Sequence, residues 1–171
     1  MFFELPGFSL TERSGQTVTL GTLKGKVWVA DFIFTTCQGP CPMMTRRMAG
    51  LQSNLAGEAG VRFLTITVDP RMDTPDRLRR YADQFRAPKD RWLFLTGERE
   101  AIYKLSTEGF RLAAIVDDAA AAPSDHPILH STKFVLVDRQ ARIRGYYDGT
   151  SEEDVKRLET DARRLAAEGT E

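Results

Sequence analysis

Apolar residues along this 171-residue chain gather in short β-branched runs that alternate with segments of helical periodicity. The clearest run, residues 27–34, is rich in β-branched and aromatic side chains and predicts a buried central strand. Apolar residues at 44, 48, 51 and 55 recur at helical steps and predict a helix that begins near Pro42. Further strands are predicted at 61–68, 92–95, 134–137 and 143–147, and further helices after Thr74, at 98–107 and around 155–165.

The start of the chain predicts a hairpin, because apolar residues at 8–10 and 18–20 flank the polar segment 14–16. Strands that alternate with helices imply a sheet covered on both faces, and the short link between the last two strands makes them an antiparallel pair. We therefore expect one α/β domain over residues 1–171, with a central mixed β-sheet flanked by helices and an N-terminal β-hairpin. Residues 109–129 match neither pattern and are expected to form a long loop.

Charge and hydropathy exclude several classes of function. Lysine and arginine total 24 and aspartate and glutamate total 24, so the chain offers no net charge to nucleic acid or to an anionic membrane. The longest apolar stretch has eight residues and contains Asp31, far fewer than the ~20 needed to span a bilayer. We expect no membrane contact within this chain, which is either cytosolic or has lost a targeting segment.

The two cysteines, Cys37 and Cys41, are the first specific indication of chemistry. A disulfide between them would close a small ring and stabilise the fold by about 2 kcal/mol, whereas one that closes a hundred-residue loop contributes about 4.7 kcal/mol. The pair is therefore better suited to reversible oxidation, or to binding one soft metal ion, than to stabilising the fold.

The predicted position of the pair favours the same chemistry. Cys37 follows the strand at 27–34 and Cys41 begins the next helix, where a partial positive charge stabilises a thiolate. We therefore expect both thiols to ionise more readily than a free cysteine. Gly39 and Pro40 favour a tight loop that brings the two sulfur atoms together.

Three residues separate Cys37 from Cys41, whereas two separate the cysteines of thioredoxins. Further distinctive blocks lie at 32–37, 68–75, 92–97 and 130–138. In this order along the chain, the cysteine spacing and these blocks resemble the SCO/SenC family of copper chaperones, which act in cytochrome c oxidase assembly.

The resemblance implies a thioredoxin-like fold and one copper ion, Cu(I) or Cu(II), held by Cys37, Cys41 and His130. Two thiolates suit Cu(I), and an added imidazole helps to retain Cu(II). The implied partner is the copper-bearing subunit of cytochrome c oxidase. The implied location is the periplasm or the mitochondrial intermembrane space, with a membrane anchor in the full-length protein, of which this chain would be the soluble domain.

A second hypothesis is a thiol–disulfide oxidoreductase in which Cys37 and Cys41 are the catalytic redox pair. Its partners would be the cysteines of the same oxidase site, another copper chaperone or a thioredoxin-like reductant. A third is a redox or metal sensor. Thioredoxin-like reductases usually carry a cis-proline where this chain has His130 and Ser131, and peroxiredoxins carry a threonine where it has Phe34. Both differences favour metal binding, and neither excludes a mixed role.

Asp31 stands inside an apolar strand, six residues before Cys37, where thioredoxins have a buried aspartate. Burial would raise its pKa and suit it to relay protons to a thiol. The alternative is a carboxylate paired with a lysine or with backbone donors. Asp69 and Asp73 match a family block and are candidates for shaping the loop at the edge of the site or for contacting a partner.

The remaining candidate ligands have simpler interpretations. His126 has no supporting block and is read as a surface residue that competes for copper at most. Met44 and Met48 lie on the apolar stripe of a predicted helix, where core packing is the usual role; together with Met43 they are weak candidates for thioether ligation.

Overall fold

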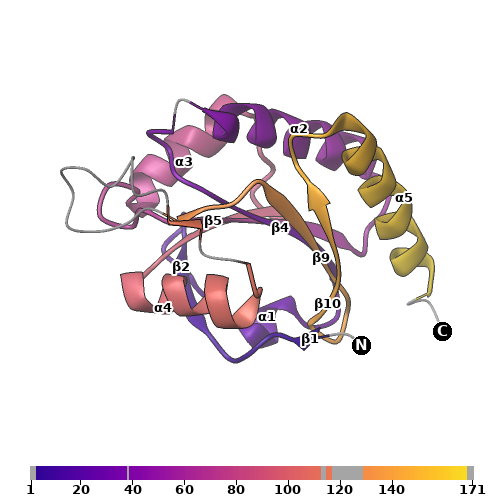
Figure 1. Ribbon diagram of the computed structural model, residues 1–171, viewed down its shortest axis with the longest axis horizontal. Helices are drawn as coiled ribbons and strands as arrows, with labels where there is room; N and C mark the ends of the chain where they lie inside the picture. The colour runs from indigo at the N-terminus through magenta and orange to yellow at the C-terminus, as the bar shows by residue number, and fades with distance from the viewer. Residues whose placement is uncertain (1–2, 38, 113–114, 117–128, 169–171) are drawn as a thin grey trace.

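The computed structural model describes residues 3–37, 39–112, 115–116 and 129–168. Within them, eight strands form one sheet in the order β1-β10-β9-β4-β5-β6-β2-β3 (Figure 1). The strands are β1 (Phe3–Glu4), β2 (Ser9–Glu12), β3 (Thr17–Thr19), β4 (Val27–Ile33), β5 (Val61–Thr67), β6 (Trp92–Thr96), β9 (Lys133–Val137) and β10 (Arg142–Asp148). A separate antiparallel pair joins β7 (Ile115–Val116) to β8 (Leu129–His130).

The centre of the sheet is parallel and its flanks are antiparallel. β4 pairs in parallel with β5, and β5 with β6, whereas β9 and β10 run antiparallel to their neighbours. All seven residues of β4 are buried, as expected for a β-branched strand with neighbours on both edges. The predicted mixed sheet is therefore confirmed.

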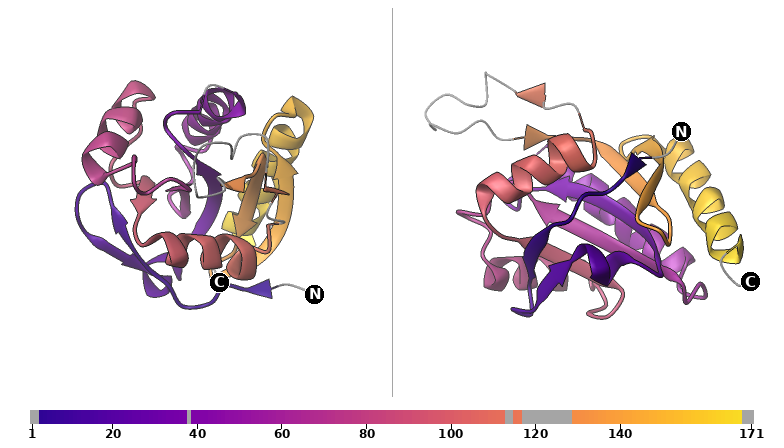
Figure 2. Two further views of the ribbon diagram at one scale, coloured as in Figure 1. Left: turned by 60° about the vertical axis from the view of Figure 1, so that its left-hand side comes forward. Right: turned by 90° about the horizontal axis from the view of Figure 1, so that it is seen from below.

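Helices cover both faces of this sheet. α2 (Pro40–Asn54), α3 (Pro75–Gln84) and α5 (Glu152–Glu168) lie on one face, and α1 (Leu20–Leu23) and α4 (Arg99–Lys104) lie on the other (Figures 1 and 2). Side chains of β4 alternate between the two cores: Val27, Val29 and Ile33 face the first, and Trp28, Ala30 and Phe32 face the second. Asp31 has the same parity as Val29 and Ile33, so it belongs to the face that carries α2 and both cysteines.

Most predicted elements are confirmed, with differences at their ends. The N-terminal hairpin forms from β2 and β3, and α3 begins after Thr74, whose hydroxyl accepts from the Arg77 amide. α2 begins at Pro40, two residues before the expected start. The predicted helix at 98–107 is α4 followed by a π-helical turn, η1 (Leu105–Gly109). The short elements β1, α1, β7 and β8 were not predicted, because two to four residues carry too little periodicity.

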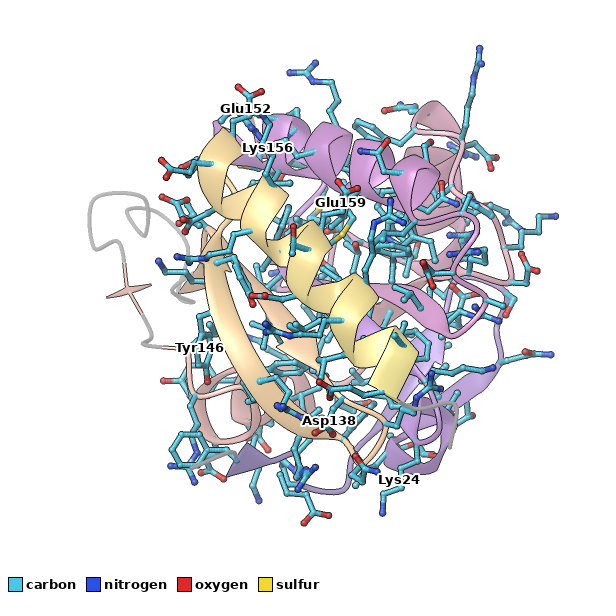
Figure 3. All side chains as sticks on the ribbon, turned by 90° about the vertical axis from the view of Figure 1, so that its right-hand side faces the viewer. Lys24, Asp138, Tyr146, Glu152, Lys156 and Glu159 are labelled. Carbon is cyan, nitrogen blue, oxygen red and sulfur yellow. The ribbon has the colours of Figure 1, made fainter. Side chains whose placement is uncertain are left out.

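The last helix, α5, packs across β10 and β4 and exposes a charged face (Figure 3). Its outward side carries Glu152 and Lys156, 74% and 75% exposed, which form an ion pair one turn apart. In the part of the chain that the structure describes, α5 and the other helices are too short or too polar to cross a bilayer.

Candidate functional site

The two cysteines lie where β4 passes into α2, in a segment that we call the cysteine loop (residues 34–37 and 39–41). After Ile33 the chain turns back, and the Cys37 amide donates to the carbonyl oxygen of Phe34 at 3.1 Å. Gly39 precedes α2 as its N-cap, and a Cβ atom added there would lie 4.0 Å from the Cys37 sulfur. The helix opens with Pro40, so Cys41 is the second residue of its first turn.

Both thiols are free, buried and close together. Cys37 is 8% exposed and Cys41 5%, and Cys37 lies near enough to Cys41 to help raise the pKa of the Cys41 thiol. The predicted closeness of the two sulfur atoms is therefore confirmed. Two reduced sulfur atoms placed close together can either lose two electrons and two protons to form a disulfide, or converge on one soft metal ion.

The expected low pKa of the Cys41 thiol is wrong. Burial raises the pKa of Cys41 to about 12, and the hydrogen bond with Cys37 and the charge of Asp31 act in the same direction. A backbone hydrogen bond with Phe34 opposes this rise without cancelling it. The partial charge at a helix N-terminus stabilises an anion by about 0.3–1 kcal/mol, which lowers a pKa by less than one unit. Full burial moves a pKa by up to roughly 3–5 units. Burial therefore decides the protonation state of Cys41 in the metal-free chain.

Asp31 lies beneath the cysteine loop with no exposed surface. Burial raises its pKa to about 7, and a hydrogen bond from the Thr65 hydroxyl to Oδ1, 2.7 Å long, acts in the opposite direction. Among the described residues, its second oxygen, Oδ2, has no hydrogen-bond partner. The predicted rise of its pKa is confirmed, and the alternative of a carboxylate paired with a lysine or with backbone donors is wrong.

The partners of Asp31 were not predicted. Thr65 on β5 stands directly opposite Asp31 on β4, and its hydroxyl also accepts from the indole nitrogen of Trp92 at 2.8 Å. Nearby, the hydroxyls of Thr45 and Tyr81 are hydrogen-bonded at 2.8 Å. A parallel register drawn between the two predicted strands would have placed Thr65 beside Asp31; the other contacts depend on the tertiary fold.

Asp69 and Asp73 lie in the turn between β5 and α3 and differ in their surroundings. Asp69 is partly exposed, and burial followed by the charge of Asp73 raises its pKa. Asp73 has no exposed surface and is bonded to Thr35 in the cysteine loop. Asp69 therefore remains a candidate for the edge of the site, whereas a partner-contact role for Asp73 is wrong because its side chain is inaccessible.

The two candidate histidines lie partly or wholly outside the described residues, whereas Met44 and Met48 are described. The backbone of His130 lies in β8, paired with Ile115, while its side chain and the whole of His126 lie outside the described residues. Among the described residues, including those around the two cysteines, no three histidine, cysteine or acidic side chains gather closely enough to hold a metal ion. Met44 and Met48 are fully buried in the core, as predicted.

Comparison with known proteins places this geometry in a family. A family model described as SCO1/SenC matches residues 4–166. A SCO1/SenC family lipoprotein from Bacillus anthracis is 36% identical, with a TM-score of 0.84 over 96% of this chain and 95% of that one.

Two further solved structures are similar. BsSco, described as having a disulfide switch and as a member of the Sco family of cytochrome c oxidase assembly proteins, is 31% identical, with a TM-score of 0.82 over 98% of this chain and 95% of that one. ScoI from Bradyrhizobium japonicum, solved with copper bound, is 25% identical, with a TM-score of 0.77 over 95% and 99% of the two chains. The fold is that of the Sco proteins, and this chain is a member of the SCO1/SenC family.

Proposed function

We propose that this chain is a copper metallochaperone that binds one copper ion through Cys37, Cys41 and His130 and delivers it to the dinuclear copper site of cytochrome c oxidase. The observation that carries the proposal is the pair of free, buried thiols that lie close together at the start of α2. A relative with the same fold was solved with copper bound, and another is described as belonging to a family of oxidase assembly proteins.

The donor set suits copper as cargo. Two sulfur donors match the softness of Cu(I), and an imidazole broadens the site to Cu(II). Both thiols must lose their protons to act as ligands, and burial holds a proton on Cys41 until the metal arrives. Three protein ligands leave a coordination position at which a ligand of the recipient can bind before the donor's ligands leave.

A copper titration of the reduced chain tests this proposal. We expect one tightly bound copper ion per chain. At a free copper concentration a thousand times the dissociation constant, binding should raise the free energy of unfolding by about 4 kcal/mol. Thermal unfolding with and without copper measures the second effect. Cys37→Ser and Cys41→Ser should each abolish tight binding, while Met43→Leu, beside the pair but outside the proposed ligand set, should not. Unchanged stoichiometry in both serine variants would contradict the assignment.

A thiol–disulfide oxidoreductase is the second candidate, favoured by Asp31. Its Oδ2 is unpartnered, and its charge raises the pKa of Cys41. In this mechanism the thiolate of one cysteine attacks a partner disulfide, which forms a mixed disulfide and releases one partner sulfur as a thiolate. Asp31 accepts the proton of the second thiol, whose sulfur then attacks the mixed disulfide. The Cys37–Cys41 disulfide forms, the other partner sulfur leaves, and the partner has gained two electrons and, from solvent, two protons.

The His130→Ala variant separates the two candidates. We expect it to lose Cu(II) strongly and Cu(I) less, since two thiolates remain, and to form the Cys37–Cys41 disulfide as the wild type does. Oxidase assembly is then measured in cells that carry only this variant. Failed assembly would support copper delivery, and full assembly despite lost copper would favour the oxidoreductase.

The proposed location is outside the cytoplasm, on the periplasmic or intermembrane-space side, with the full-length protein anchored to a membrane. The similar protein from Bacillus anthracis is described as a lipoprotein, which supports an anchored domain of this fold.

A further inference from the structure

We propose that Asp73 is a positioning residue that fixes the turn before Cys37 and thereby sets how readily the two thiols form a disulfide or close on one copper ion. The copper part of this inference rests on the proposed function, whereas the disulfide part requires only the two free thiols. Asp73 itself touches neither reacting sulfur in the contacts described, so it acts through Thr35.

The Asp73 carboxylate is buried and receives three hydrogen bonds. The Thr35 amide donates to Oδ2 at 3.0 Å, the Thr35 hydroxyl donates to Oδ1, and the Thr67 hydroxyl donates to Oδ2 at 2.5 Å. The Asp73 carboxylate has no exposed surface, so water cannot reach it to replace these donors, and a variant that loses them loses the anchor of the turn.

These contacts hold the cysteine loop from outside it. Thr35 is the second residue of the turn from Phe34 to Cys37, which the Cys37 amide closes. The Asp73 carboxylate accepts from both the amide and the hydroxyl of Thr35. It therefore fixes the peptide plane and the side-chain rotamer of Thr35 together. The anchor is itself rigid, because the Asp73 amide donates to the carbonyl oxygen of Asp69 at 2.9 Å and Thr67 ends the buried strand β5.

Arg77 adds a weaker, exposed part of the same network. Its Nε donates to the Thr35 hydroxyl oxygen at 2.9 Å and lies 3.7 Å from Oδ1 of Asp73. The Arg77 side chain is 44% exposed, so its ion pair with Asp73 contributes little. The bonds from Thr35 to the buried carboxylate of Asp73 are therefore the ones that position the turn.

Orientation matters here because both reactions need two sulfur atoms in one geometry. Holding two reactants in place raises their effective concentration, and loosening them lowers it. Without the Asp73 contacts we expect the equilibrium constant for disulfide formation to fall about tenfold, which makes the reduction potential about 30 mV less negative. Copper affinity should fall by a similar factor, because ordering of the loop would then accompany binding.

The test uses the full chain with Asp73→Asn and Thr35→Val. Each variant is equilibrated with reduced and oxidised dithiothreitol, which passes two electrons and two protons to or from the Cys37–Cys41 pair, and copper affinity is measured in parallel. Thr35→Val replaces the hydroxyl with a methyl group and keeps the amide that donates to Asp73, so the test stays decisive if Asp73→Asn fails to fold. Thr35→Ser retains the hydroxyl and should stay within about twofold of the wild type.

The matched control is Asp138→Asn. Asp138 is 3% exposed and accepts from the backbone amides of Gln140 and Arg142. It follows β9 beside the start of β4, whereas the cysteine loop follows the opposite end of β4. We expect this variant to lose stability with an unchanged disulfide equilibrium. Thr35→Val with wild-type equilibrium constants, or an equal shift in Asp138→Asn, would overturn the inference. If the wild type binds no copper, the proposed function fails and the disulfide equilibrium still decides the role of Asp73.

Discussion

The free energy of unfolding is expected to fall by about 3 kcal/mol between pH 5 and pH 9 because of one buried carboxyl group, that of Asp31. Its pKa is raised from 3.8 to about 7 by burial, so the folded chain binds its proton more tightly than the unfolded chain does. The resulting stabilisation, roughly 4 kcal/mol, is complete below the unfolded pKa and disappears as pH rises through 7.

Two variants isolate this effect in urea denaturation at pH 5, 7 and 9. Asp31→Asn cannot ionise, so its stability should be nearly constant where that of the wild type falls. Thr65→Val removes the hydrogen bond that lowers the pKa of Asp31, so the loss of stability should move to higher pH. Equal pH dependence in the wild type and Asp31→Asn would mean that another group is responsible.

The framework of the fold could be predicted because its elements carry strong local patterns. All seven residues of β4 are buried, and the run at 27–34 already indicated this. The amphipathic face of α2 likewise appeared in the spacing of its methionines and leucines. β1 has two residues and joins the sheet only through its pairing with β10, a contact that no short stretch of sequence encodes.

The chemistry of the site was predictable to the extent that it depends on neighbours in sequence. The spacing of Cys37 and Cys41 and the apolar surroundings of Asp31 were sufficient to predict that the thiols lie close together and that the carboxyl pKa is raised. The hydrogen bonds from Thr35 to Asp73 join residues 38 positions apart, so they follow only from the fold. The pKa of Cys41 was wrongly predicted because the helix terminus is visible in the sequence, whereas the depth of burial is not.

The raised pKa of Cys41 should have a large effect on how the rate of alkylation of its thiol depends on pH. In a Cys37→Ser variant, we expect the rate of alkylation by iodoacetamide to rise about tenfold per pH unit from pH 7 to pH 10, without levelling off. The thiolate is the reacting species, and burial, which remains in this variant, is the largest cause of the raised pKa. A thiol that ionises near pH 8.5 would instead reach a constant rate by about pH 9.5.

The same variant in concentrated urea supplies the control for the alkylation experiment. Unfolding exposes Cys41 to water, so its rate should level off near the pKa of an ordinary cysteine, about 8.5. Circular dichroism at each pH confirms that the native sample stays folded, which matters because ionisation of Asp31 weakens the fold in the same range. A native profile that levels off below pH 9 would show that the helix terminus outweighs burial. Copper binding would then displace no proton from Cys41 at a pH above that lower pKa, and the rise of copper affinity with pH would end there.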